Sequence, residues 1–200
     1  MTDGVNDTFR TLNRCSESLY KVKGSKHFGY AFPVSNEEEI RFHLDELRKQ
    51  HHAARHHCYA WRLGADGNHF RANDDGEPSN SAGKPILGQL QSFDINNALV
   101  VVVRYFGGTK LGVGGLIDAY RTAARQAIEA NEITEELVMH EVSVGFTYER
   151  MGAVMKVLKD FNLEMLQHSF GADCSLSVEV RKSLAPAVSE ALEKAATWGD

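Results

Sequence analysis

The densest concentration of residues suited to chemistry lies between residues 104 and 121, which read R-Y-F-G-G-T-K-L-G-V-G-G-L-I-D-A-Y-R. Five of the 17 glycines fall in positions 107–115, directly after the apolar run 98–103 and before a helical pattern. Glycines at a strand-to-helix turn let backbone N–H groups converge, and the helix N-terminus adds a partial positive charge. The stretch therefore predicts a binding site for an anion.

Basic side chains near this turn could complete such a site. Arg104 ends the strand, Lys110 lies in the turn and Lys84 stands in a neighbouring loop, and all three suit phosphate. The pattern is neither G-x-x-x-x-G-K-[ST] nor G-x-G-x-x-G, so it implies neither nucleotide-binding mechanism. In the alternative interpretation, the glycines only permit a tight turn and close packing. The predicted anion- or nucleic-acid-binding residues are Arg104, Gly107, Gly108, Lys110, Gly112, Gly114, Gly115 and Lys84.

A second group is acidic and lies in the loop N-D-D-G-E-P. Asp74, Asp75 and Glu77 supply three carboxylates, enough to consider a divalent cation or a general base. The spacing does not match an EF-hand loop, and Asp-Gly and Glu-Pro are common in turns, so a solvated turn is favoured. If the loop lies beside the glycine turn, acid next to base would mark a ligand site.

Histidines form a third concentration, because seven of nine lie between residues 27 and 69. His52 and His56 are four apart, but the segment leaves a helix and enters a strand, which disrupts the two-histidine metal geometry. Both are kept as possible ligand-loop residues, and no metal or cofactor is predicted. Cys58 lies in an apolar strand and is interpreted as a small core residue. No nucleophile–base pair is evident, so enzymatic activity is left uncertain.

Aromatic residues near these groups could stack on unpaired bases. Tyr59, Trp61, Tyr105 and Phe106 are the candidates, although most aromatics that alternate in strands belong to the core.

Charge and composition limit the partners. Residues 1–130 carry a net charge of +1 and residues 131–200 a net charge of −6, so RNA would bind the first part. The first fourteen residues are polar and no apolar run approaches 18 residues, which predicts neither a signal peptide nor a membrane partner. Three widely spaced cysteines suit a reducing compartment, so we expect a cytoplasmic protein.

Periodic patterns predict the elements that must position these groups. Ser35 and Glu38 suggest a capping box for a helix over 36–50, with two strands before it. H-H-C-Y-A-W-R-L and A-L-V-V-V-V-R-Y-F predict two further strands, the second buried on both faces, with R-A-N-D-D-G-E-P-S-N-S-A-G-K-P-I-L as a polar loop between them. A helix follows the glycines, and the order βαββα follows that helix. We therefore predict an α+β protein with domains over 1–133 and 134–200.

Three sequence blocks also carry a resemblance to a known family. R-Y-F-G-G-T-K-L-G-V-G-G-L, D-D-G-E-P-S-N-S-A-G-K-P-I-L and H-x-A-x-H-x-C-Y-A resemble the signature of the IMPACT/YigZ family. The likeness implies a first domain similar to the second domain of ribosomal protein S-five, which contains a βαβ unit. It also implies a ferredoxin-like second domain similar to one in elongation factor G. Family members often have a basic residue and a glycine where this chain has Asp118 and Arg121.

The resemblance also implies candidate partners. Eukaryotic relatives bind the activator of a general-control kinase and restrain the response to amino-acid starvation, but they use an additional N-terminal domain, so that particular role is not expected to transfer. The resemblance still implies a role near translation. We therefore expect a regulatory binding protein linked to translation or the stress response. Its expected partners are RNA, the ribosome or translation factors, or another protein, with no DNA specificity. The alternatives are an enzyme of phosphate chemistry, by fold analogy with small-molecule kinases, and a purely protein-interaction module.

Overall fold

The computed structural model describes residues 7–171 and 173–197, which form two compact units. The larger unit is Phe9–Glu136, and the smaller begins at Leu137 and includes Asp7 and Thr8. The predicted boundary after residue 133 falls in strand β7 (Ile133–Leu137), which pairs with β1 (Thr8–Leu12). Neither strand was predicted, because pairing between segments more than 100 residues apart leaves no local pattern.

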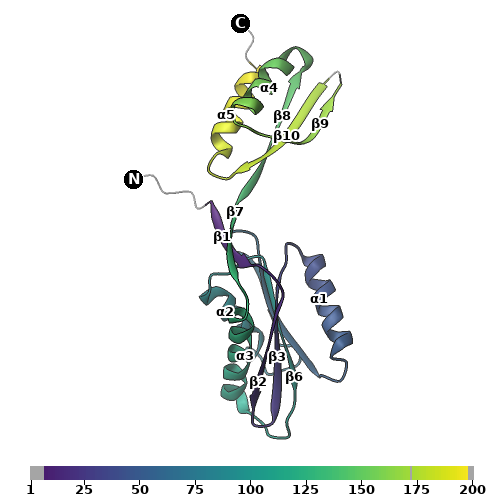
Figure 1. The fold of residues 1–200 in the computed structure, drawn as a ribbon. Coiled ribbons are helices and arrows are strands. Elements are labelled where there is room, and N and C mark those ends of the chain that lie inside the picture. The colour runs from purple at the N-terminus through teal and green to yellow at the C-terminus, as the bar shows by residue number, and fades with distance from the viewer. Residues whose placement is uncertain (1–6, 172, 198–200) are drawn as a thin grey trace, which may run out of the picture. The chain divides into compact units, whose positions relative to one another are not determined.

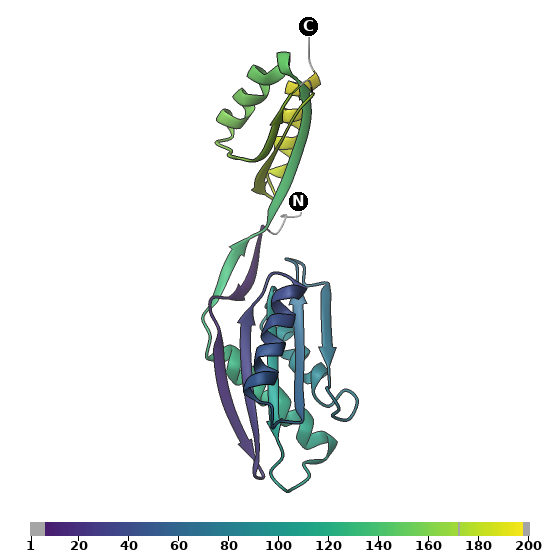
Figure 2. The same cartoon turned by 90° about the vertical axis from the view of Figure 1, so that its right-hand side faces the viewer.

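A five-stranded antiparallel sheet forms the centre of the larger unit (Figures 1 and 2). Its strands, in spatial order, are β2 (Ser16–Val22), β3 (Ser25–Pro33), β6 (Ala98–Tyr105), β4 (His56–Leu63) and β5 (His69–Asn73). Since β6 is antiparallel to both neighbours, β3 and β4 run parallel to each other on either side of it. Helix α1 (Glu37–Gln50) connects them as a βαβ unit split by β6.

Helices cover both faces of this sheet, with α1 on one side and α2 (Gly83–Ser92) and α3 (Gly112–Glu129) on the other (Figure 1). The apolar run 98–103 in β6 has no exposed surface, which confirms the prediction of a strand buried on both faces. Alternate residues of β6 contribute to two separate cores, one beneath each helical layer.

The N-cap of helix α1 lies one residue later than the capping box predicted, at position 36 and not at position 35. Asn36 is the N-cap, and its side-chain oxygen accepts hydrogen bonds from the N–H groups of Glu38 and Glu39. Glu39 reaches back and accepts a bond of 2.8 Å from the Ser35 N–H. Asn and Ser both cap helices well, so the local sequence offered two overlapping starts.

The prediction of a single polar loop between β4 and β6 is wrong at both ends. Its first residues belong to the edge strand β5, and G-K-P-I-L begins helix α2. Pro85 is tolerated there because an N–H in the first helical turn has no intrahelical partner. The buried face of α2, which includes Ile86 and Leu90, stabilises it against the sheet.

The smaller unit follows the predicted order of elements. It contains β8 (Met139–Thr147), a short 3-10 turn η1 (Tyr148–Arg150), α4 (Met151–Asp160), β9 (Met165–Phe170), β10 (Asp173–Arg181) and α5 (Ala185–Thr197). The strands form an antiparallel sheet in the order β8-β10-β9, and its apolar side chains pack against α4 and α5. None of the helices in the described chain has the length and apolarity needed to cross a bilayer.

Candidate functional site: a basic hollow at the end of strand β6

Three basic residues lie side by side across the central strands, on the face covered by α2 and α3. Arg104 of β6 is paired in register with His27 of β3 on one side and with His56 of β4 on the other. Side chains of directly paired residues point to the same face of a sheet. His27 and Arg104 are buried, whereas His56 is half-buried. The row therefore runs from the interior to the surface.

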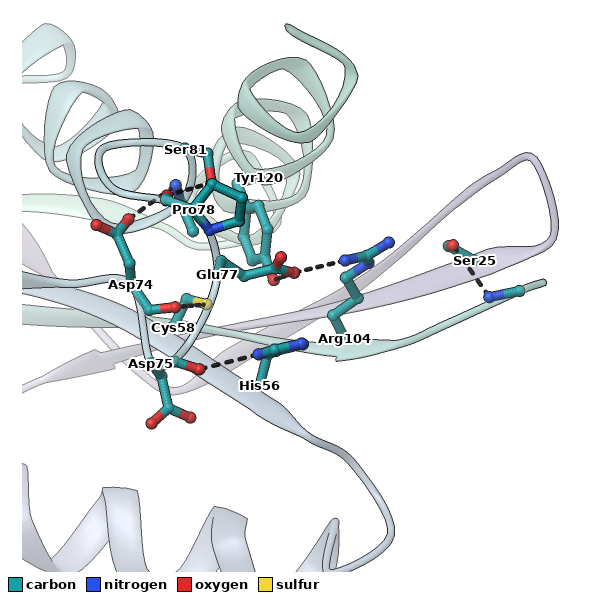
Figure 3. A network of polar contacts seen from close by, with 12 residues as sticks. Ser25, His56, Cys58, Asp74, Asp75, Glu77, Pro78, Ser81, Arg104 and Tyr120 are labelled. Carbon is teal, nitrogen blue, oxygen red and sulfur yellow. Dashed lines mark hydrogen bonds and ion pairs between the residues drawn. The ribbon is translucent and has the colours of Figure 1, made fainter. Parts of the chain in front are cut away.

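A carboxylate from the loop after β5 neutralises the centre of this row (Figure 3). Glu77 Oε1 accepts a hydrogen bond of 2.6 Å from Arg104 Nη1 and one of 2.7 Å from the Tyr120 hydroxyl. The side chains of Glu77 and Arg104 are only 4% and 8% exposed. Burial raises the pKa of Tyr120, so its hydroxyl stays protonated and donates.

This pairing changes the role expected of Arg104. The arginine is not a free cation at the surface, because the Glu77 carboxylate already balances its charge. The acidic loop was expected to lie beside the basic residues of the glycine turn, and Glu77 and Arg104 are in direct contact. Binding of an outside anion by Arg104 stays a prediction, and such an anion would have to share the guanidinium with Glu77.

Asp74 has a structural role in the same loop. Its Oδ1 accepts hydrogen bonds of 3.0 and 2.8 Å from the N–H groups of Ala82 and Gly83, and its Oδ2 accepts one of 2.8 Å from Asn80. These donors lie at and just before the start of α2, where a carboxylate satisfies free N–H groups and complements the helix dipole. Asp74 therefore caps α2 although it lies nine residues before the helix begins.

Asp75 fixes the other side of the loop to strand β4. Its Oδ2 accepts a bond of 2.6 Å from the His57 N–H, and its carbonyl bonds to His56 Nδ1 at 2.9 Å. A carbonyl can only accept, so His56 carries a proton on Nδ1. Within 7–171 and 173–197, no group of three His, Cys, Asp or Glu residues is arranged to hold a metal ion.

Cys58 and His27 complete the buried surroundings of Glu77. Cys58 has no exposed surface, its thiol donates to the Asp74 carbonyl at 2.9 Å, and burial raises its pKa, so it is the core residue that was expected. The His27 ring meets the Tyr120 ring edge-on at 5.3 Å between centroids. Neither His27 nitrogen has a hydrogen-bond partner in the described chain.

Packing and backbone conformation account for part of the glycine turn. A Cβ at Gly107 would lie 1.9 Å from the carbonyl carbon of Gly24, and the Gly107 N–H donates to Ser25 Oγ at 3.1 Å. Gly112 has a φ of +73°, which disfavours a side chain. Neither packing nor backbone conformation requires a glycine at position 114, since nothing lies within 4 Å of an added Cβ and its φ is not positive.

We expect Gly107→Ala to lower the free energy of unfolding by about 1–3 kcal/mol, because its Cβ would overlap the backbone of the β2–β3 turn. Gly114→Ala is the matched control. It should raise stability by up to about 1 kcal/mol, since alanine favours the helix and the space is open. Urea unfolding of both variants measures the difference. Equal stability of Gly107→Ala and the parent would show that the close approach to Gly24 is not required.

The start of α3 offers backbone donors to a ligand. Leu111 at the N-cap position makes no side-chain capping bond, and the first turn contains no acidic residue. Gly108, Gly114 and the preceding Lys110 are exposed. Helix N-termini of this kind attract anions. Further along the helix, Asp118 is paired with Arg121 at 2.9 Å, so these two departures from the family pattern balance each other.

A hollow of about 410 Å³ opens where β4 begins and β6 ends. Arg104, Tyr105 and Phe106 line it from β6 and the residue after it, and Ala53, Arg55 and His56 line it from the other side. Phe106 is 59% exposed, and the Arg104 guanidinium carbon lies 5.7 Å from its ring centroid. None of the described residues that line it carries a carboxylate. Positive charge beside an open aromatic face suits a phosphate joined to a planar base.

The structure assembles only part of the predicted site. His56, Arg104 and Phe106 share the hollow, whereas His52, Lys84 and Lys110 are exposed and do not line it. Tyr59 and Trp61 are buried, and Tyr105 is half-buried, so the expectation that most of these aromatics are core residues is confirmed.

Sequence reasoning missed Arg55 and Tyr120 as site residues. Arg55 lies inside the quoted H-x-A-x-H block, and no ion pair in the described chain involves it. The Tyr120 hydroxyl was hidden within an apolar helical pattern. Only the position of Arg55 in that block could have drawn attention to it.

These features define a class of mixed α/β proteins with two compact units and a buried ion pair near the end of the strand that precedes a glycine-rich turn. The Impact N-terminal domain matches residues 23–128, which include four of the five strands of the central sheet (all but β2), the acidic loop and the glycine turn. The chain belongs to the IMPACT family, which confirms the resemblance found in its motifs.

Bacterial relatives extend the match beyond this domain. The IMPACT family member YvyE of Bacillus subtilis (strain 168) is 31% identical over 178 residues, covering 88% of this chain and 82% of the relative. YigZ of Escherichia coli (strain K12) is 31% identical over 160 residues, covering 79% of this chain and 78% of YigZ.

One solved structure gives the same relationship at the level of the fold. A crystal structure described as that of a hypothetical protein is 27% identical and covers 94% of this chain and 92% of its own, with a TM-score of 0.77. A structure described as the two-domain translational regulator Yih1 is 28% identical over 61% of this chain and 47% of its own. Its TM-score of 0.35 is too low to support an inference.

Proposed function

We propose that this protein is a regulatory binding protein linked to translation and that it binds RNA or another phosphate-containing ligand at the hollow and the adjoining glycine turn. The observation that carries the proposal is the lining of the hollow, which combines Arg55, His56 and Arg104 with the exposed Phe106 ring and contains no carboxylate. A phosphate would contact the bases, and an attached planar ring would stack on Phe106.

The backbone beyond Phe106 favours the same ligand chemistry. Five residues, 107–111, connect Phe106 to the uncapped start of α3, and Lys110 adds a further exposed positive charge. An extended polyanion could follow this path from the hollow to the helix N-terminus. Gly114 supports the idea, because neither packing nor conformation requires a glycine there and its absent side chain leaves the first helical turn accessible.

The translational part of the proposal depends on family membership. Membership supports a partner among the ribosome, translation factors or a regulatory protein, as the resemblance of the motifs implies. RNA binding would be one means of reaching that machinery.

The alternative of a phosphate-chemistry enzyme gains no support from the acidic loop. The Asp74 oxygens accept three backbone N–H bonds, and the Asp75 carboxylate accepts one from His57. Carboxylates that fix a loop in this way are poorly placed to act as a general base. Ligand binding is therefore the function that the geometry supports best.

The proposal can be tested by binding to total cellular RNA and ribosomal particles over a salt series. The variant Arg55→Ala/Lys110→Ala removes two exposed charges and leaves the buried ion pair intact. We expect affinity to fall about tenfold and the slope of log affinity against log salt to become shallower by about 1 to 2.

A matched control removes equal charge from elsewhere in the larger unit. Arg41 lies on α1 and Arg71 on β5, and both side chains are exposed. The Arg41→Ala/Arg71→Ala variant should bind as the parent does. Unchanged binding by Arg55→Ala/Lys110→Ala, or equal losses in both double variants, would rule out a site at this hollow.

A further inference from the structure

A second hollow, of about 440 Å³, lies between helix α1 and the sheet edge formed by β2 and β3. It is on the opposite face of the sheet from Arg104. Its size falls within the range of small-ligand and side-chain pockets, which runs from about 300 to 1,000 Å³. The proposed RNA site uses none of its lining residues.

Aromatic rings form one wall of this hollow. The Phe32 and His43 rings are stacked, with centroids 4.1 Å apart and planes inclined by 17°. The Tyr30 ring is inclined by 13° to Phe32, with its centroid 6.4 Å away. Three nearly parallel rings therefore line the hollow. The Tyr30 hydroxyl is bonded to His51 Nε2 at 2.7 Å and the residue is 8% exposed, so the half-buried Phe32 and His43 present most of the accessible ring surface.

Carboxylates border this aromatic wall on two sides. Glu17 of β2 is paired in register with Tyr30, which places both side chains on one face of the sheet. Glu46 lies on α1 three residues after His43, at the spacing of neighbours on a helix surface. Glu17 forms no ion pair with any base in the described part of the chain, and Glu46 is paired with Lys49 at 2.7 Å.

No cation in the lining balances these carboxylates. The lining contains no Lys or Arg, and burial lowers the pKa of His43 below 6.5, which favours its neutral form near pH 7. Lys21 is the next lysine along β2, four residues from Glu17 and thus about 13 Å away along the strand. The hollow therefore combines aromatic faces with the charge of Glu17, which no ion pair in the described chain balances, and with Glu46, whose charge is shared with Lys49 outside the lining.

We propose that this hollow binds the guanidinium group of an arginine side chain presented by a protein partner. A guanidinium is planar and can stack on the parallel rings while its N–H groups bond to Glu17 and Glu46. A lysine ammonium lacks the flat shape and the forked donors, so it fits these groups less well. The inference does not depend on the proposed binding of RNA.

The site can be tested with short peptides and two-dimensional NMR of the labelled protein. The probes are acetyl-Gly-Arg-Gly-amide and two peptides in which citrulline or lysine replaces the arginine. Citrulline has nearly the shape of arginine but no charge. We expect the arginine peptide to shift the amide signals of Phe32 and His43 saturably. The citrulline peptide should leave these signals in place, and the lysine peptide should bind more weakly.

Variants separate the proposed contacts from nonspecific attraction. Glu17→Gln/Glu46→Gln should raise the dissociation constant of the arginine peptide at least fivefold. Asp45→Asn is the matched control, because Asp45 is an exposed acid on α1 that does not line the hollow. It should change the constant less than twofold, and the spectra of both variants report directly whether the fold is retained.

Three outcomes would overturn the inference. One is the absence of a saturable shift at Phe32 and His43, and another is an equal effect of the citrulline peptide. The third is binding of the lysine peptide as tightly as the arginine peptide, which would contradict the assignment to a guanidinium. RNA binding by Glu17→Gln/Glu46→Gln should match the parent, so failure at one site is distinguishable from failure at the other.

Discussion

Arg104→Ala is expected to lower the free energy of unfolding by about 3–5 kcal/mol, because it leaves the Glu77 carboxylate buried without its cation. The Glu77 side chain is 4% exposed, and among the described residues the hydroxyl of Tyr120 would be its one remaining side-chain donor. Water reaches such a group poorly, so the lost contact is not replaced by hydration. Urea unfolding monitored by circular dichroism measures the loss.

A double-mutant cycle identifies the cause of that loss. Glu77→Gln removes the charge from the other partner, and Glu77→Gln/Arg104→Ala leaves no charge at the pair. We expect the double variant to be more stable than Arg104→Ala, because no unpaired carboxylate remains. Arg121→Ala is the surface control. Its pair with Asp118 is exposed and should contribute only about 0–1 kcal/mol.

This prediction also affects how ligand binding is tested. A loss of RNA binding in Arg104→Ala could reflect unfolding of the loop that Glu77 fixes. The exposed residues Arg55 and Lys110 avoid this difficulty. If Arg104→Ala destabilised the protein by less than about 1 kcal/mol, the ion pair would not be an important part of the folded state.

Acid is expected to destabilise the larger unit through His27. Burial, and next the positive charge of Arg104, lower the pKa of His27 from 6.5 to about 4, while Glu77 acts in the opposite direction. Between about pH 6.5 and 4, His27 is therefore protonated in the unfolded chain but neutral in the folded chain. The stability that His27 contributes is fully present above this window and is lost as the pH falls through it.

The size of this effect can be isolated with one substitution. Between pH 7 and 4.5 we expect the parent to lose about 2–3 kcal/mol more than His27→Leu, which cannot titrate at this position. His52→Ala is the control, because His52 is exposed. Urea unfolding at the two pH values measures all three proteins. An equal acid loss in the parent and His27→Leu would contradict the assignment.

Most regular elements could be predicted because their patterns are local. The apolar run of β6 shows a strand covered on both sides, and the spacing of Ile40, Leu44 and Leu47 shows the buried face of α1. The βαββα order of the smaller unit was also predictable. Elements without such patterns were missed, including β5, which has exposed side chains, and α2, whose first turn contains a proline.

The sequence by itself determined the family, the main helices and strands, and the glycine-rich turn after β6, because each depends on residues that are near one another in the chain. Only the tertiary structure decided that Arg104 pairs with Glu77, 27 residues away, and lies beside His27 in register. It also assigned Asp74 to the start of α2 and formed the two hollows. The physical reason is that a charged or polar side chain takes its role from the partners and the degree of burial that folding brings to it. Local sequence shows which groups are available, but it does not show which of them will meet.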